Sequence, residues 1–145
     1  ILEMDKYLAS YKLADLFLDT FNYNGHTTVS ESLWAGTPVI TKIGKSFSAR
    51  VADSLLNAID MPNLIVKNNN DYIDLVLDIY LNKEKFYEIK SKLTDNIKTK
   101  PLFHTTQYTQ NLETVFYYYL GIFLKNQPCY VIIGYWTSAI SKNVL

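Results

Sequence analysis

Apolar and polar segments alternate between residues 14 and 41, and this order narrows the choice of fold. The run 14–18 (Ala-Asp-Leu-Phe-Leu) is too short for a helix and suits a buried strand. Three apolar residues then recur at helical spacing, and they are Val29, Leu33 and Trp34. Gly36 is placed to end this helix, and Pro38 opens a second apolar run that suits a strand. Strand, helix and strand joined by short loops predict a right-handed crossover and a parallel pair of strands.

The loop before this helix carries the residues that most directly suggest chemistry. It delivers a glycine, a histidine and two threonines to the helix N-terminus, namely Gly25, His26, Thr27 and Thr28. Free N–H groups and the helix dipole favour an anion at such a position. Two hydroxyls and an imidazole add donors, so we predict a diphosphate site at these four residues. A competing hypothesis is that Thr28 and Glu31 form a capping box, which would make both residues structural.

A second loop, residues 42–46, follows the second predicted strand and should open on the same edge of the sheet. Lys45 and Ser46 form a second candidate phosphate-contacting loop. The alternatives are that Lys45 is simply solvated and that Ser46 caps the next helix. Further along, an apolar stripe predicts a long C-terminal helix with one buried face, formed by Leu112, Val115, Phe116, Tyr119, Leu120 and Phe123.

Composition excludes several classes of function. The chain of 145 residues has 14 basic and 14 acidic side chains, so its neutral balance gives no reason to expect nucleic acid or a membrane surface as partner. One cysteine and two histidines are too few for a structural zinc site, and we expect no metal. The single cysteine and the lack of a signal peptide predict a cytoplasmic protein.

Five blocks of sequence also carry a family resemblance. They are residues 13–15 (Leu-Ala-Asp), 24–28 (Asn-Gly-His-Thr-Thr), 33–38 (Leu-Trp-Ala-Gly-Thr-Pro), 48–52 (Ser-Ala-Arg-Val-Ala) and 101–103 (Pro-Leu-Phe). In this order they resemble the C-terminal catalytic region of the O-linked N-acetylglucosamine transferase and SPINDLY-like glycosyltransferase family. The likeness runs from about Tyr7 to about Leu124, which is nearly the whole chain.

The resemblance implies an α/β fold with a Rossmann-like parallel sheet and flanking helices, the C-terminal half of a GT-B glycosyltransferase, ending in a long helix. Residues 1–128 would form the nucleotide-sugar-binding half-domain, as a fragment of a longer chain. Residues 129–145 match no segment of the family and stay unassigned.

By the same resemblance, the chain would be the donor-binding half of a metal-independent protein O-glycosyltransferase that needs no cofactor. It would take N-acetylglucosamine from UDP-GlcNAc to Ser or Thr hydroxyls of a protein. Gly25 to Thr28 would bind the donor diphosphate. Glu31 matches a family aspartate that contacts the ribose, and Tyr7 matches a histidine that stacks on the base. No residue of this half is a certain catalytic residue, because the acceptor site would lie in the missing N-terminal half and its TPR repeats.

Two alternatives remain open from the sequence. A related transferase would use another donor, such as GDP-fucose or UDP-glucose. A non-catalytic nucleotide-binding or scaffold module is favoured by Met4, which stands where the family has a nucleotide-contacting lysine, and by the tyrosine at position 7. The unbroken run from Gly25 to Thr28 favours the enzyme.

Overall fold

A computed structural model describes residues 3–124 and shows a three-stranded parallel sheet at the centre of the fold. The strands are β1 (Phe17–Leu18), β2 (Val39–Lys42) and β3 (Ile65–Val66), in the spatial order β1-β2-β3. Phe17 pairs with Val39, and Thr41 pairs with Ile65, both in parallel register. The predicted parallel pair and the α/β fold class are therefore confirmed.

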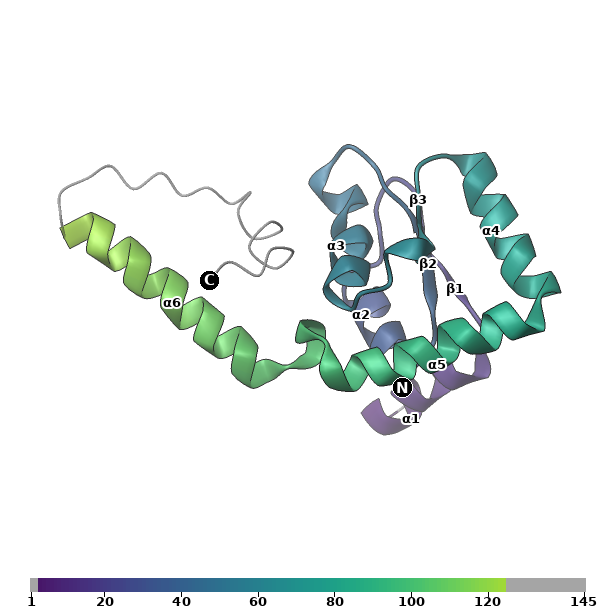
Figure 1. The fold of residues 1–145 in the computed structure, drawn as a ribbon, viewed down its shortest axis with the longest axis horizontal. Helices are drawn as coiled ribbons and strands as arrows, with labels where there is room; N and C mark the ends of the chain where they lie inside the picture. Colours follow the sequence, from purple (N-terminus) through teal and green to yellow (C-terminus); the bar gives the residue numbers. More distant parts are fainter. Residues whose placement is uncertain (1–2, 125–145) are drawn as a thin grey trace.

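The described part of the chain contains six α-helices. They are α1 (Met4–Ser10), α2 (Thr27–Trp34), α3 (Val51–Ala58), α4 (Asn69–Leu81), α5 (Lys83–Thr99) and α6 (Thr105–Leu124). Short 3-10 turns lie at Tyr11–Leu13, Phe47–Ala49, Pro62–Leu64 and Pro101–Phe103. Figure 1 shows α2 and α3 on one side of the sheet, α4 on the other and α5 across the lower ends of the strands.

The core forms where α2, α3 and α5 meet the sheet. Its fully buried side chains include Val29, Leu33, Val39, Ile40, Leu56 and Leu93. The predicted end of α2 is confirmed, because Gly36 adopts a φ of +85° and its N–H donates to the Leu33 carbonyl at 3.0 Å. Only glycine takes up this left-handed conformation without strain, so the sequence fixes the point at which the chain turns toward β2.

Three large apolar side chains are exposed, and two of them, Leu18 and Trp34, belong to the apolar patterns that predicted the first strand and the helix after it. Trp34 is 54% exposed, because it lies in the last turn of α2 and meets the Phe103 ring edge-on at 5.0 Å. Phe47 is 73% exposed because it begins a 3-10 turn that precedes α3. Leu18 is 53% exposed because β1 is an edge strand, shorter than the predicted run 14–18.

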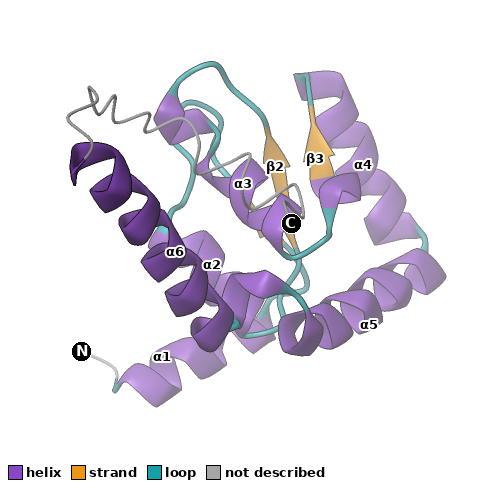
Figure 2. Cartoon of the chain, turned by 60° about the vertical axis from the view of Figure 1, so that its left-hand side comes forward, coloured by secondary structure: helices purple, strands orange, loops and turns teal. Residues whose placement is uncertain are grey.

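The long helix α6 is present, but its predicted buried face is wrong for the part that the structure describes. The helix extends away from the sheet and the helices around it (Figures 1 and 2). Leu112 and Tyr119 are half-buried, whereas the other four residues of the stripe, Val115, Phe116, Leu120 and Phe123, are exposed. The helical period identifies an apolar face but not what covers it. The boundary predicted at residue 128 and the segment 129–145 lie outside the described residues.

Within residues 3–124, no helix combines the length and the apolar character that crossing a bilayer requires.

Candidate functional site

The N-terminus of α2 is open to a ligand. His26 is the residue before the helix, and its side chain does not cap the first turn. Within residues 3–124, the N–H groups of Thr27, Thr28 and Val29 therefore have neither an intrahelical nor a side-chain acceptor. The proposed capping box does not form, because Thr28 lies inside the helix and Glu31 bonds elsewhere, to two tyrosines. Thr27 and Thr28 are exposed, so their hydroxyls are accessible at the same point.

The same three-residue sequence begins α6, and there it behaves differently. His104 precedes Thr105 and Thr106, and the His104 Nδ1 atom accepts a hydrogen bond from the Gln107 N–H at 3.3 Å. His104 thus caps one N–H group in the first turn of α6. The contrast shows that the open end of α2 comes from its loop and not from the residue types alone.

A buried carboxylate, that of Asp19, fixes the loop that precedes α2. Asp19 is 4% exposed and directly follows β1. Its Oδ1 accepts a hydrogen bond from the Gly25 N–H at 2.7 Å, and its Oδ2 accepts one from the Thr41 hydroxyl of β2 at 2.6 Å. Such short bonds to a carboxylate are among the stronger hydrogen bonds in proteins. Asp19 therefore fixes the loop backbone against the neighbouring strand.

Asn24 joins the two loops at this edge of the sheet. It is 1% exposed, and its backbone N–H donates to the Ser48 carbonyl at 2.8 Å. Its side-chain oxygen accepts from the Ala52 N–H at 3.3 Å, and so caps the first turn of α3. Its amide nitrogen donates to the Thr20 carbonyl at 2.9 Å. Neither Asn24 nor Asp19 was a predicted site residue, although Asp19 is a polar residue directly after a strand, which was the signal available for it.

The His26 ring lies between two aromatic rings. It stacks on Tyr23 with centroids 4.8 Å apart and meets the Phe47 ring edge-on at 6.3 Å. The His26 Nε2 atom is buried, yet it has no hydrogen-bond partner within residues 3–124. Because buried polar atoms are nearly always hydrogen-bonded, an unpartnered nitrogen at the start of a helix points to a missing ligand.

Glu31 and Tyr7, the predicted ribose and base residues, are brought together. The Tyr7 hydroxyl donates to Glu31 Oε2 at 3.0 Å, and the Tyr11 hydroxyl donates to the same oxygen at 3.2 Å. The two hydroxyls are 2.9 Å apart. Burial first, and then the contacts with Tyr7 and Glu31, raise the pKa of Tyr11. Tyr11 was not among the predicted site residues.

The second loop, residues 42–46, has fewer side chains fixed in place for a ligand. Lys45 and Ser46 are both exposed. Ser46 lies 3.1 Å from the Ser48 hydroxyl and does not cap the following turn with its side chain, so that part of the prediction is wrong. The loop is closed by the Gly44 N–H, which donates to the Ala49 carbonyl at 2.8 Å. The role of Lys45 and Ser46 toward a phosphate stays a prediction.

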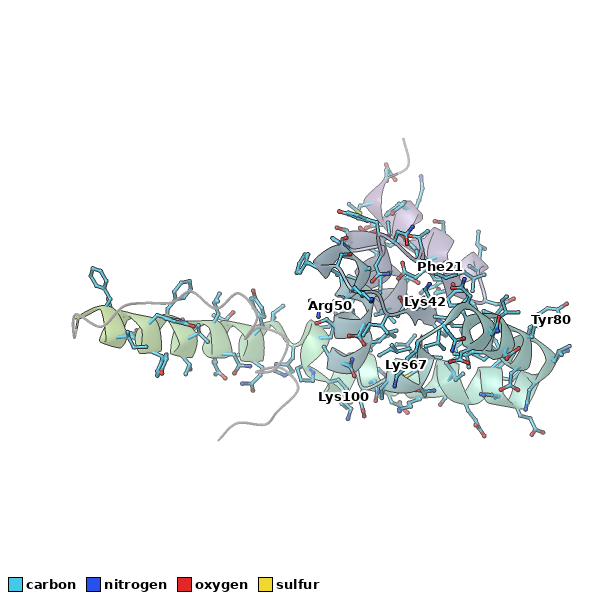
Figure 3. All side chains as sticks on the ribbon, turned by 90° about the horizontal axis from the view of Figure 1, so that it is seen from above. Phe21, Lys42, Arg50, Lys67, Tyr80 and Lys100 are labelled. Carbon is cyan, nitrogen blue, oxygen red and sulfur yellow. The ribbon has the colours of Figure 1, made fainter. Side chains whose placement is uncertain are left out.

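A polar hollow of about 530 Å³ lies between the end of β2 and the segment that joins β3 to α4, and it is lined by Lys42, Lys67, Asn68, Asn69, Asn70 and Asp71. None of the α2 loop residues lines it. The Lys42 Nζ atom donates to Asn69 Oδ1 at 2.8 Å and lies 4.5 Å from the centroid of the Phe21 ring. Figure 3 labels Lys42 and Phe21. The Lys42 amine is therefore already engaged by Asn69 and by the Phe21 ring.

Tyr72 of α4 ties this helix to the base of the site. It is 7% exposed, and its hydroxyl donates to the Asp19 carbonyl at 3.2 Å. Burial, together with the charge of Asp19, raises the pKa of Tyr72 to about 12. Between pH 10 and 12 the unfolded chain therefore releases a proton that the folded chain keeps, so this residue lowers the stability of the fold as the pH rises.

A Tyr72→Phe variant should show this dependence. At pH 8 we expect it to be less stable than wild type by about 1 kcal/mol, because the hydrogen bond to Asp19 is lost. By pH 11 the deficit should have vanished, because wild type alone carries the penalty of about 1.4 kcal/mol per pH unit. Urea unfolding of both proteins at the two pH values measures this. A deficit that stays constant from pH 8 to pH 11 would contradict the raised pKa.

Comparison with known proteins finds relatives that share one kind of name. The curated protein named "Probable UDP-N-acetylglucosamine--peptide N-acetylglucosaminyltransferase SPINDLY" of Petunia hybrida is 32% identical over 110 residues, which are 76% of this chain and 12% of that protein. The similarly named SEC protein of Arabidopsis thaliana is 38% identical over 106 residues, or 72% of this chain and 11% of that one. The UDP-N-acetylglucosamine–peptide N-acetylglucosaminyltransferase of Caenorhabditis elegans is 33% identical over 102 residues, 70% and 9% of the two chains.

A solved structure shares the fold. A lysine-to-methionine mutant of the Thermobaculum terrenum O-GlcNAc transferase superimposes with a TM-score of 0.73 at 28% identity, over 79% of this chain and 22% of that one. The present chain thus spans about a tenth of the length of the curated relatives it matches. The profile of Glycosyl transferase family 41 matches residues 4–112, and the chain belongs to this family.

Proposed function

We propose that this chain is the donor-binding part of a protein O-glycosyltransferase, which transfers N-acetylglucosamine from UDP-GlcNAc to Ser or Thr hydroxyls of an acceptor protein. The names of the relatives describe, for those proteins, the transfer of N-acetylglucosamine from UDP-N-acetylglucosamine to a peptide. The observation that carries the proposal for this chain is the open N-terminus of α2, where the buried His26 Nε2 atom has no hydrogen-bond partner among the described residues. An unsatisfied imidazole beside free helix N–H groups and threonine hydroxyls suits the oxygens of a diphosphate.

The reaction leaves negative charge on the departing UDP. Donors already aimed at the diphosphate stabilise that charge as the bond to the sugar breaks. In this proposal Gly25, His26, Thr27 and Thr28 supply those donors, the helix dipole adds to them, and no metal or cofactor takes part. The hydrogen bonds of Asp19 and Asn24 keep these hydrogen-bonding groups in place before the nucleotide sugar binds.

The remaining parts of the enzyme belong to the proposal as well. We propose that an N-terminal catalytic half and TPR repeats supply the acceptor site and the group that assists deprotonation of the acceptor hydroxyl. The chain of 145 residues would then bind the donor but transfer sugar poorly by itself. A cytoplasmic location fits the single cysteine of the sequence.

Calorimetric titration with UDP tests the proposal. Wild type should bind UDP, and a His26→Ala/Thr27→Ala variant should bind it at least about tenfold more weakly, because hydrogen bonds to a charged ligand are lost. The matched control is His104→Ala/Thr105→Ala, which changes the same residue types at the start of α6 and should bind UDP like wild type.

Two results would count against the proposal. Equal affinity of the His26→Ala/Thr27→Ala variant and wild type would remove the α2 loop from the site. Tighter binding of GDP than of UDP would mean that the sugar donor is a guanosine nucleotide and not UDP-GlcNAc.

A further inference from the structure

The carboxylate of Glu31 is held on one side by a pair of tyrosines. The Tyr7 and Tyr11 hydroxyls lie 3.0 Å and 3.2 Å from Oε2 and 2.9 Å from each other. All three side chains are half-buried. Within the described residues, the other oxygen, Oε1, accepts no hydrogen bond. Oε2 is thus hydrogen-bonded to residues of α1 and of the 3-10 turn after it, whereas Oε1 is able to accept a hydrogen bond from a ligand.

Tyr11 is itself fixed at two points. Its backbone carbonyl accepts a hydrogen bond from the Thr37 hydroxyl at 2.8 Å, which ties it to the turn between α2 and β2. Its ring stacks on Phe17 of β1, with centroids 6.5 Å apart and planes 29° from parallel. A hydroxyl on so constrained a ring restricts a glutamate that would otherwise sample many rotamers. Ordering such a side chain in advance removes an entropic cost from ligand binding.

The position of Glu31 indicates what the free oxygen would meet. Glu31 lies four residues after Thr27, which is about 6 Å further along the axis of α2. A nucleotide whose phosphates lie at the start of α2 and whose nucleoside runs alongside this helix, the direction that the family resemblance implies for Glu31, would place its ribose at this point. Its two hydroxyls are donors, and a carboxylate oxygen is their strongest natural acceptor.

We propose that Tyr11 is a positioning residue which, together with Tyr7, fixes Glu31 so that its free oxygen accepts hydrogen bonds from the ribose diol of the bound nucleotide. The tyrosine pair thereby makes the site selective for ribonucleotides. This inference rests on the proposed function, because it takes the diphosphate to lie at the start of α2.

The test compares UDP with 2′,3′-dideoxy-UDP, which lacks the diol, by calorimetry on the 145-residue chain. Wild type should prefer UDP by about tenfold or more. Tyr11→Phe and Tyr7→Phe keep their rings and should each reduce this preference to about threefold, with the affinity for the dideoxy nucleotide unchanged within about twofold. Glu31→Ala should abolish the preference. Tyr80→Phe, at an exposed tyrosine in the last turn of α4 (Figure 3), should leave both affinities as in wild type.

The outcomes separate this inference from the proposed function. If wild type does not bind UDP, both fail. If wild type prefers UDP and Tyr11→Phe keeps the full preference, the tyrosines only join α1 to α2, and this inference alone is overturned. If Tyr11→Phe weakens UDP and the dideoxy nucleotide by the same factor, the role of Tyr11 is structural, which also overturns it.

Discussion

Replacing Asp19 with alanine is expected to lower the free energy of unfolding by about 3 kcal/mol. The substitution leaves the Gly25 N–H and the Thr41 hydroxyl without their acceptor. Thr41 is fully buried, so water cannot replace Asp19 as the acceptor of its hydroxyl hydrogen bond. Because a buried donor without a partner costs more than a hydrogen bond contributes, the effect should be large. Urea unfolding at pH 7 measures it, and UDP affinity should fall as well, since the α2 loop loses its anchor.

Two further variants make this prediction specific. Asp15→Ala changes an exposed aspartate of the same segment and should shift stability by no more than about 0.5 kcal/mol. Thr41→Val removes one of the orphaned donors while nearly keeping the shape of the side chain. The Asp19→Ala/Thr41→Val double variant should therefore be more stable, by about 1 kcal/mol, than the sum of the two single effects indicates. Strictly additive effects would show that Asp19 and Thr41 do not depend on each other.

The sequence predicted the parts of the fold that local rules decide. The order strand, loop, helix and strand between residues 14 and 41 predicted a parallel pair, because a short crossover has few alternatives. Gly36 marked the end of α2 through its backbone conformation. The run of asparagines at 68–70 is typical of a loop that supplies a helix cap, and the Asn68 side chain accepts a hydrogen bond from the Asp71 N–H at 2.8 Å. These features depend on residues within one turn of each other.

The parts that the sequence did not predict depend on contacts between distant segments. Asn24 caps α3 from 28 residues away, and Glu31 bonds Tyr7 from 24 residues away. No local pattern encodes such pairs, so the Thr28–Glu31 capping box was a reasonable hypothesis that the tertiary structure overruled. The stripe of α6 failed for a related reason, since a periodic apolar face does not reveal what packs against it.

The residues assigned to the diphosphate are therefore better supported than those assigned to the second loop. Gly25 is held by Asp19, and His26 lies against Tyr23 with an unpartnered nitrogen. Lys45, by contrast, is exposed, and the residues that the structure describes give it no hydrogen bond or ion pair. A preorganised loop is what leaving-group stabilisation needs, because donors that must first be ordered lose much of their effect.

Gly25→Ala is expected to weaken UDP binding by about a hundredfold, with a smaller effect on folding. A Cβ atom at this position would lie 2.5 Å from the Thr28 hydroxyl and 3.0 Å from Val29 Cγ2. Val29 is fully buried and has little room to move, whereas Thr28 is exposed and turns away readily. The clash would therefore displace the hydroxyl and the loop N–H groups that the diphosphate needs. Repacking of this kind costs the fold about 1–2 kcal/mol.

Gly36→Ala at the other end of α2 supplies the control that separates binding from stability. No atom lies within 4 Å of a Cβ at Gly36, but its φ of +85° strains alanine, at a cost of about 1 kcal/mol. The two variants should lose similar stability in urea unfolding, and only Gly25→Ala should lose affinity for UDP. Equal affinities in the two variants would mean that the nucleotide does not contact the start of α2. The diphosphate would then have to be sought at another part of the edge formed by the strand ends.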